Sequence, residues 1–432
     1  MRHLGRFRAS ASGLLSFAVV AFGLAGSIKA GDAPAASDTV QILDATKAGE
    51  LAVTVRGAGD DHVKFTIQNK SARRLNVVIP PGLVAASSAG QGFQSMGLGV
   101  PTSNPGGFGA FRSGRDGQGF RSIPAVAPSL DGIGVSPGQT IELPVPSVCL
   151  NFGLPTPTAK NVFELVDVET FTPDVRVRKA LKSLATLGTS QGVAQATMWN
   201  VCNGMSFGQI GAQSVKPINS HELAQAARFV EALDLASSDL VDANYFQQGR
   251  ILLRVGGTGP FAKDARRLVG ELEGTRMMGL PIQVVESLDG VNARPGTIFL
   301  SAAIVASKPG HTTLKVSVRS TTATGEWRSL GQFDVASDSA VSDLKADALA
   351  SDVGRAMART YVSVVPVRRT PGTTTVRVTN RLPMTIANVT LKAGKAGDPV
   401  TLQGLGIGPV RSATAPIPAA TAVVDSVELN GL

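Results

Sequence analysis

Hydrophobic and polar residues alternate in three short runs between residues 49 and 80. Each run puts three apolar side chains on one face, as a strand does: Leu51, Val53 and Val55; Val63, Phe65 and Ile67; Leu75, Val77 and Ile79. Strands with one apolar and one polar face are typical of antiparallel sheets that are packed on one side. The runs therefore predict a β-sandwich-type domain, which we place at 49–240.

Two segments interrupt that alternation. Residues 89–122 hold ten glycines among few apolar residues, too few to offset the entropy of ordering the segment, so we interpret them as a loop. Residues 172–236 carry helix signals instead, namely Thr172 before a proline, Ser190, and Asn219 at the start of a capping box. Such residues act as N-caps of helices. We therefore expect a helical segment appended to the first sandwich.

Beyond residue 245 the pattern mixes both periods. A strand-like run at 251–255 is followed by a helical pattern at 260–273, then by further strands and a second long helix. This order predicts an α+β module at 245–365, since a repeating strand–helix alternation is absent. Strand alternation returns at 366–432, which we expect to form a small β domain.

The two end domains share a spacing. Asn69 and Asn380 each end a strand, and the next strand starts six residues later, at Leu75 and Ile386. This similarity indicates an internal repeat of one strand–turn–strand unit. The predicted fold class is mainly β with α+β: two antiparallel β-sandwich-type domains flank an α+β module.

Residues 1–30 have the features of an export signal. Basic residues precede an eleven-residue apolar core at 14–24, and Ala30 offers a small residue for cleavage. The core is shorter than the ~20 residues that span a bilayer, and no later apolar run reaches that length, so we expect no transmembrane segment after signal removal. Residues 31–48, rich in Ala, Asp and Ser, are interpreted as a linker. We expect an exported protein that is periplasmic, cell-surface or secreted.

Charge and composition exclude several function classes. The chain carries a net charge of +9, and removing the four basic residues of the signal leaves +5. So small a charge, without interleaved aromatics, argues against nucleic-acid binding. An exported chain has no routine access to ATP or NAD, and His62, His221 and His311 are too far apart in the sequence to indicate a metal site. We expect neither a cofactor nor a metal.

Two short motifs resemble catalytic or cofactor signatures. Residues 204–208 match the nucleophile elbow G-x-S-x-G around Ser206, but the elbow needs a strand before the serine, and here a predicted helix precedes it. Residues 257–262 match the dinucleotide pattern G-x-G-x-x-A, and Glu286 follows the next strand. The strands beyond lack alternating helices, so we interpret 257–262 as a tight turn between a strand and a helix.

Cys149 and Cys202 are an even number of cysteines in an exported chain, which permits one disulfide. The apolar residues that flank Cys149, and the segment from Gln195 to Trp199, resemble the Cys-apolar and Gln-x-x-apolar-Trp motifs of thioester domains in bacterial surface adhesins. That resemblance implies a thioester between Cys149 and Gln195, with Trp199 as an apolar wall. The stretch from Cys149 to Trp199 also resembles a segment of uncharacterised exported proteins of planctomycete-type bacteria.

Helix geometry limits these alternatives. Gln195 and Cys202 are seven residues apart, which is roughly 10 Å along a helix at 1.5 Å per residue. Cys149 can therefore reach Gln195 or Cys202, but not both. A Cys149–Cys202 disulfide, two unlinked thiols and a Cys149–Gln195 thioester stay open.

Together these features predict an exported, soluble, multi-domain protein without catalytic activity. Its expected partner is an extracellular or envelope protein or a polysaccharide. One alternative is a covalent surface adhesin that carries the Cys149–Gln195 thioester. The second alternative is a serine hydrolase that uses Ser206.

Overall fold

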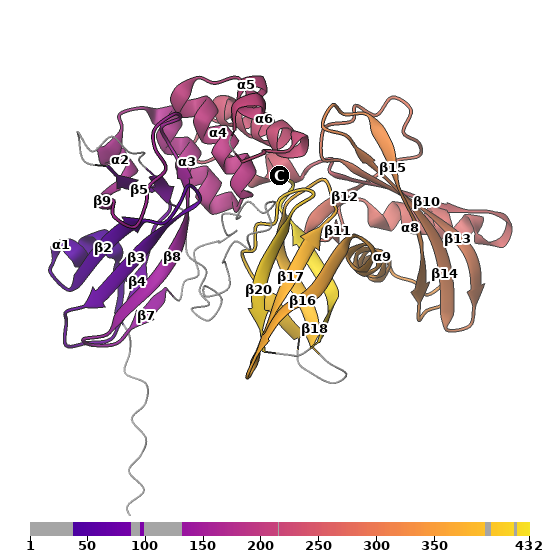
Figure 1. Cartoon of the computed structure of the whole chain (residues 1–432). Helices are drawn as coiled ribbons and strands as arrows, with labels where there is room; N and C mark the ends of the chain where they lie inside the picture. The colour runs from indigo at the N-terminus through magenta and orange to yellow at the C-terminus, as the bar shows by residue number, and fades with distance from the viewer. Residues whose placement is uncertain (1–37, 88–95, 99–131, 215, 394–398, 419–420) are drawn as a thin grey trace, which may run out of the picture. The chain divides into compact units, whose positions relative to one another are not determined.

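The computed structural model describes residues 38–87, 96–98, 132–214, 216–393, 399–418 and 421–432 (Figure 1). The predicted export signal at 1–30 lies outside these residues, and so does the predicted loop at 89–122 except for 96–98. The described chain is mainly β, with helices between its β parts. The predicted class, mainly β with α+β, is confirmed.

Six strands of the first domain close into a barrel, in the order β2-β3-β8-β6-β5-β9. Their bounds are β2 Leu51–Gly57, β3 His62–Asn69, β5 Leu83–Ala86, β6 Met96–Leu98, β8 Thr140–Cys149 and β9 Val162–Asp167. Val63, Phe65 and Ile67 on β3 are fully buried, as the alternation predicts. These strands form one closed barrel, and not the two separate sheets of the predicted sandwich, because β9 pairs with both β2 and β5.

A smaller sheet accompanies the barrel, in the order β1-β4-β7. Its elements, with the helix that follows β1, are β1 Asp38–Gln41, α1 Ile42–Lys47, β4 Leu75–Val78 and β7 Ile133–Val135. β1 runs parallel to β4, and both Ile42 and Ala45 of α1 are buried. The predicted linker at 31–48 is therefore structured from residue 38 on. The prediction missed this structure because the segment is rich in Ala and Asp and has only a few apolar residues, which pack on the barrel.

Helices follow the barrel, as predicted for 172–236. They are α2 Val168–Phe171, α3 Val175–Leu187, α4 Gln191–Asn203, α5 Phe207–Gln213, α6 Ser220–Leu235 and α7 Ala243–Gln247. Ser190 caps α4 and Asn219 caps α6, as the sequence predicts. Asp174, and not Thr172, caps α3, because its carboxylate accepts the N–H of Arg176 at 2.8 Å.

The α+β module contains a six-stranded sheet in the order β11-β12-β10-β13-β14-β15. The strands and helices are β10 Ile251–Gly257, α8 Ala262–Leu272, β11 Arg276–Met277, β12 Leu280–Val284, β13 Ile298–Lys308, β14 His311–Thr321, β15 Trp327–Ser337 and α9 Ala346–Tyr361. A short 3₁₀ turn, η2 at Gly259–Phe261, precedes α8. The central strand β10 is parallel to both of its neighbours, β12 and β13.

The last β region forms two three-stranded sheets, β16-β17-β20 and β19-β18-β21. Their strands are β16 Val362–Thr370, β17 Thr373–Asn380, β18 Ile386–Ala393, β19 Pro399–Leu402, β20 Ser412–Ile417 and β21 Ala422–Leu429. Both sheets contribute to one hydrophobic core that also includes α9 and the sheet of the α+β module. The predicted boundary near 366 therefore falls inside β16 and inside a continuous core.

Asn69 and Asn380, which the sequence relates by spacing, are both fully buried and make equivalent hydrogen bonds. Each side-chain oxygen accepts the N–H two residues later, and each Nδ2 donates to the carbonyl four residues later at 2.8 Å. Each Nδ2 also donates to a distant carbonyl, that of Val135 or Ile407. That residue pairs with the strand start six positions after the asparagine. The sequence repeat therefore corresponds to a repeated corner.

Candidate functional site

Cys149 and Gln195 lie side by side where β8 meets α4. Gln195 Oε1 accepts the main-chain N–H of Cys149 at 2.9 Å, and Gln195 Nε2 donates to the Cys149 carbonyl oxygen at 2.8 Å. Both residues are buried. The structure thus brings together the two residues of the thioester hypothesis, but the hydrogen bonds run through the main chain of Cys149.

At the end of β8, two glutamine side chains of α4 make the main-chain hydrogen bonds that a neighbouring strand would make. β3 stops pairing with β8 near Ser147, whose N–H donates to the Asp61 carbonyl at 2.9 Å. Beyond it, Gln191 Nε2 donates to the Ser147 carbonyl at 2.8 Å, and Gln195 bonds Cys149. Residues four apart share a helix face, and unpaired buried main-chain groups are costly. The spacing of the two glutamines therefore has a structural role.

The thiol of Cys149 interacts with a different group. Its Sγ donates to the Asp60 carbonyl oxygen at 3.5 Å. Burial, together with the negative charge of Asp60, raises the pKa of Cys149 to about 12, so the thiol is protonated at neutral pH. A protonated, buried thiol is a weak nucleophile. Acylation would require the thiol to leave Asp60 and Gln195 to release both hydrogen bonds to the main chain.

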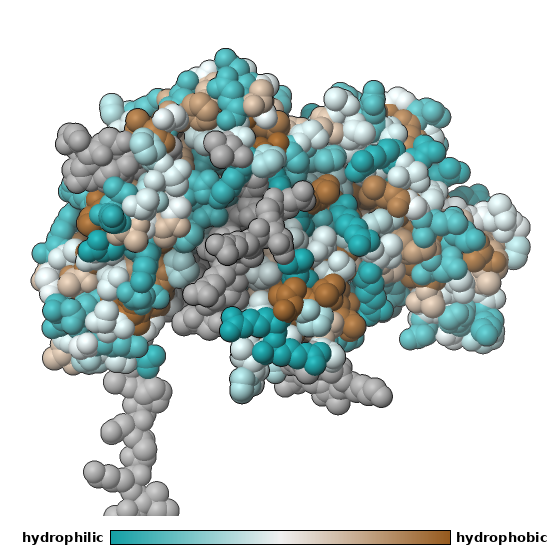
Figure 2. All heavy atoms as spheres, viewed as in Figure 1, coloured by the Kyte–Doolittle hydropathy of each residue, from teal (hydrophilic) through white to brown (hydrophobic). Residues whose placement is uncertain are grey.

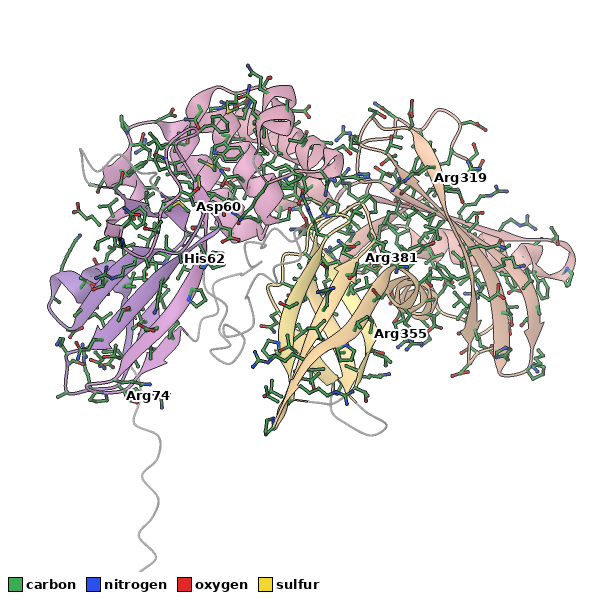
Figure 3. All side chains as sticks on the ribbon, in the orientation of Figure 1. Asp60, His62, Arg74, Arg319, Arg355 and Arg381 are labelled. Carbon is green, nitrogen blue, oxygen red and sulfur yellow. The ribbon has the colours of Figure 1, made fainter. Side chains whose placement is uncertain are left out.

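A polar network covers this end of β3, where Figure 3 labels Asp60 and His62. Lys216 forms an ion pair with Asp60, and its Nζ lies 3.7 Å from Asp61 Oδ2. His62 Nδ1 bonds the Asp61 carboxylate. Among the described residues, no group of three or more His, Cys, Asp or Glu side chains could hold a metal ion. The network is one of ion pairs and hydrogen bonds.

Cys149 and Cys202 are free thiols in the structure, so the disulfide, one of the three alternatives that the sequence left open, is not formed. The physical reason is the position of α4, which sets Gln195 opposite Cys149 and leaves Cys202 two turns further along the helix. Burial, with the charge of Asp174, raises the pKa of Cys202 to about 12 as well. Helix geometry allowed Cys149 to reach either Gln195 or Cys202, and in the structure Cys149 contacts Gln195.

Trp199 packs within the helical segment. Its ring stands edge-on to Phe152, with ring centroids 5.0 Å apart. It also packs against a small apolar cluster that includes Val193 and Ala196 of α4. Its indole N–H has no hydrogen-bond partner within the part of the chain that the structure describes. Trp199 therefore contributes to packing one turn beyond Gln195.

Ser206 caps helix α5. Its Oγ accepts the N–H of Gln209 at 3.3 Å, and Gln209 Oε1 accepts the N–H of Ser206 at 2.9 Å. Helix α4 precedes Ser206, so the strand–serine–helix order of a nucleophile elbow is not formed. The serine hydroxyl is engaged in a capping box.

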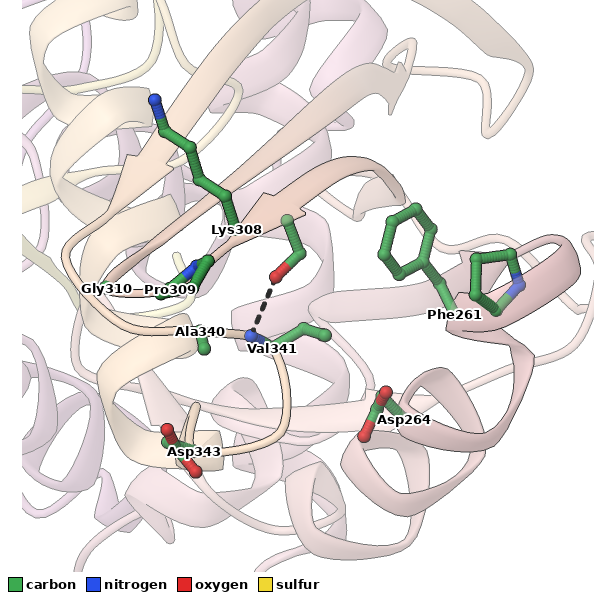
Figure 4. A pocket seen from close by; sticks show the side chains of 10 residues that line it. Phe261, Asp264, Lys308, Pro309, Gly310, Ala340, Val341 and Asp343 are labelled. Atoms are coloured by element: carbon green, nitrogen blue, oxygen red, sulfur yellow. Dashed lines mark hydrogen bonds between the residues drawn. The ribbon is translucent and has the colours of Figure 1, made fainter.

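The glycine-rich turn at 257–262 lies at the carboxyl end of β10. β12 and β13 flank β10 on opposite sides. The chain passes from β10 to β12 on one side and then to β13 on the other, so the carboxyl end of β10 is a topological switch point. An open cleft of about 530 Å³ lies here, between the turn, the β13–β14 hairpin and the segment before α9 (Figure 4). Glu286, which follows β12, is outside the lining of this cleft.

The cleft combines an aromatic side chain with charged groups. Phe261, Asp264, Lys308 and Asp343 line it. The N–H of Val341 donates to Ser307 Oγ at 3.0 Å and so joins two of its walls (Figure 4). Sequence reasoning missed this cleft because it depends on the pairing of β10 with the distant strand β13. The glycine-rich turn was its one local signal.

Comparisons with protein-family models, with characterised proteins and with solved structures gave no match. The resemblances to adhesin thioester domains and to planctomycete-type exported proteins therefore stay predictions. No helix within the described ranges is long and apolar enough to cross a membrane.

Proposed function

We propose that this chain is an exported, non-enzymatic binding protein whose ligand is a polysaccharide of the cell envelope or extracellular space. The cleft at the carboxyl ends of β10 and β13 carries this proposal. Ligands of folds with parallel strands bind at such switch points, and binding sites are concave with a few polar groups. The predicted export signal at 1–30 supports a place outside the cytoplasm.

The lining of the cleft suits a hydroxyl-rich ligand. The Phe261 ring offers an apolar face to the C–H groups of a sugar. The carboxylates of Asp264 and Asp343 accept hydrogen bonds from hydroxyl groups, and Lys308 donates them. Two carboxylates beside one ammonium disfavour a strongly anionic ligand. A neutral saccharide fits these groups best.

The candidate nucleophiles support a non-enzymatic role. Ser206 is held in a helix cap, and the Cys149 thiol is protonated and buried. Nucleophilic catalysis needs an adjacent base or a lowered pKa, whereas burial raises the pKa of Cys149. The groups that would carry covalent chemistry therefore have structural roles in this arrangement.

The covalent adhesin is a second candidate function. The observation that favours it is the contact of the Gln195 carboxamide with Cys149. The intact mass of the unreduced protein distinguishes it from the binding protein.

Calorimetric titration of the mature protein with soluble oligosaccharides released from bacterial envelopes tests the proposal. We expect Phe261→Ala and Asp264→Asn to weaken binding by about tenfold each, since a hydrogen bond or an aromatic contact in a site contributes ~1 kcal/mol or more. Asp239→Asn, at an exposed position in the helical region, is the control. Unchanged affinity in both cleft variants would show that the ligand binds elsewhere.

A further inference from the structure

The six-stranded sheet of the α+β module has a second face, opposite helices α8 and α9. Ile251 and Leu253 of β10 and Ile282 of β12 face the core that contains both helices. Successive side chains of a strand point to opposite faces of the sheet. Leu252 and Gln283, which pair with each other, therefore lie on the second face. Leu252 is only 2% exposed there, so other segments of the chain cover this face beside it.

An open cavity of about 490 Å³ lies on that second face. Leu252 and Gln283 of the sheet line it, and its other walls come from the segment before β10, from the loop at 290–294 and from Thr297. Its volume is within the range of ~300–1,000 Å³ that is typical of sites for small ligands. It shares no lining residue with the cleft of the proposed saccharide site.

The loop wall of this cavity is held in place through its main chain. The hydroxyl groups of Thr297 and Thr321 donate to the Arg294 carbonyl at 2.7 and 2.9 Å. The fully buried Arg250 donates to the next carbonyl, that of Pro295. A wall that is fixed before a ligand arrives lowers the entropy lost on binding. The cavity is therefore preformed on this side.

Three carboxamides and one guanidinium line the cavity. The carboxamides belong to Gln248, Gln283 and Asn292, and the guanidinium belongs to Arg294. All four side chains are exposed. Within the described part of the chain, none of them has a hydrogen-bond or ion-pair partner. Each carboxamide offers donors beside an acceptor, so the cavity suits a ligand that also carries both kinds of group.

We propose that this cavity binds a short peptide through its main chain and its free carboxyl terminus. A carboxamide matches a peptide group in both hydrogen-bonding directions, as Gln195 does with Cys149 within this chain. Arg294 suits the terminal carboxylate, because a guanidinium can bond both of its oxygens. Leu252 and Val291 offer apolar contacts to the side chains of the peptide. No aromatic ring of the described chain lines the cavity, which favours a peptide over a sugar that would stack on one.

Calorimetric titration of the full mature chain with trialanine and with its C-terminal amide tests this site. We expect trialanine to bind about tenfold more tightly than the amide, because only its carboxylate makes a charge-assisted contact with Arg294. Arg294→Gln, at an exposed position, should weaken trialanine binding about tenfold and leave binding of the amide unchanged. Arg254→Gln, an exposed arginine of β10 outside the cavity lining, is the matched control.

A second variant tests the carboxamides. We expect Gln283→Met to weaken binding of trialanine and of its amide about fivefold each, because it removes a hydrogen bond to the main chain that both peptides share. Gln332→Met on β15 is the matched control, since Gln332 is exposed and lies outside the cavity lining. Cross-strand pairing through Ser317 and Ser301 places Gln332 on the same sheet face as Arg254.

The proposal is overturned if trialanine does not bind, or if the Arg294 variant binds trialanine as tightly as the unmodified protein. It is also overturned if N-acetylglucosamine binds in place of the peptides and loses affinity in the Arg294 and Gln283 variants, because the cavity would then be a saccharide site. Phe261→Ala alters only the cleft of the proposed function and should bind trialanine normally. Failure of one proposal is therefore distinguishable from failure of the other.

Discussion

At the scale of the residue, Gln195 shows how one side chain can complete a strand. Its carboxamide presents an acceptor and a donor in the arrangement of a peptide group, and both meet Cys149. A motif that resembles a thioester pair therefore also has a purely structural explanation. The two explanations differ in what happens when the carboxamide is removed and in the covalent state of the thiol.

We predict that Gln195→Met lowers the free energy of unfolding by ~1–3 kcal/mol, the cost of leaving buried main-chain donors and acceptors unpaired. Methionine has a similar volume but cannot hydrogen-bond strongly, so the loss reports on the carboxamide. Urea denaturation followed by circular dichroism measures it. Gln213→Met, at an exposed position, is the control. A change below ~0.5 kcal/mol, within the range of surface substitutions, would contradict the structural role.

The covalent state of the cysteines gives a second prediction at this scale. Because both pKa values are raised to about 12 by burial, we expect a thiol reagent at pH 8 to label neither cysteine quickly in the folded protein. Both should label after denaturation. The intact mass of the unreduced mature protein should equal the sum of its residue masses plus one water. A mass lower by ~17 Da would indicate the thioester and one lower by ~2 Da a disulfide, since each bond releases ammonia or two hydrogens.

At the scale of the element, local signals were predictable and long-range pairings were not. Ser190 and Asn219 were identified as caps because a cap depends on a few neighbouring residues. The parallel pairing of β1 with β4, the closure of the barrel by β9 and the cleft beside Phe261 depend on residues far apart in the chain. The repeated corner at Asn69 and Asn380 was predictable only in part. Some of its hydrogen bonds join neighbouring residues, and others join residues far apart in the chain.

We predict that Asn69→Ala and Asn380→Ala each lower the free energy of unfolding by ~2 kcal/mol or more, because each removes several hydrogen bonds and leaves buried carbonyls unpaired. The larger loss is expected for Asn380, whose Nδ2 serves three carbonyls against two for Asn69. Urea denaturation measures both. Asn244→Ala, at an exposed position, is the control, and two corner variants no less stable than it would refute the repeated corner.

At the scale of the whole molecule, helix α6 joins parts that the sequence assigned to separate domains. Glu222 on α6 forms a buried ion pair with Arg411 at 2.5 Å, and Asn219 Nδ2 donates to the Pro409 carbonyl at 2.9 Å. Arg250 and Asn430 add further contacts of this kind. The described residues accordingly belong to one compact unit. Domain boundaries drawn from changes in periodicity cannot detect such contacts, because each involves single polar residues.

The ion pair between Glu222 and Arg411 offers the sharpest test of this joining. We predict that Glu222→Gln lowers the free energy of unfolding by ~3 kcal/mol, because it leaves a largely buried guanidinium without its counter-charge. The double variant Glu222→Gln/Arg411→Met should recover part of that loss, since it also removes the positive charge that Glu222 neutralises. Calorimetry measures both, with Glu286→Gln at an exposed position as the control. If the double variant is less stable than Glu222→Gln, the loss comes from packing and the charge argument fails.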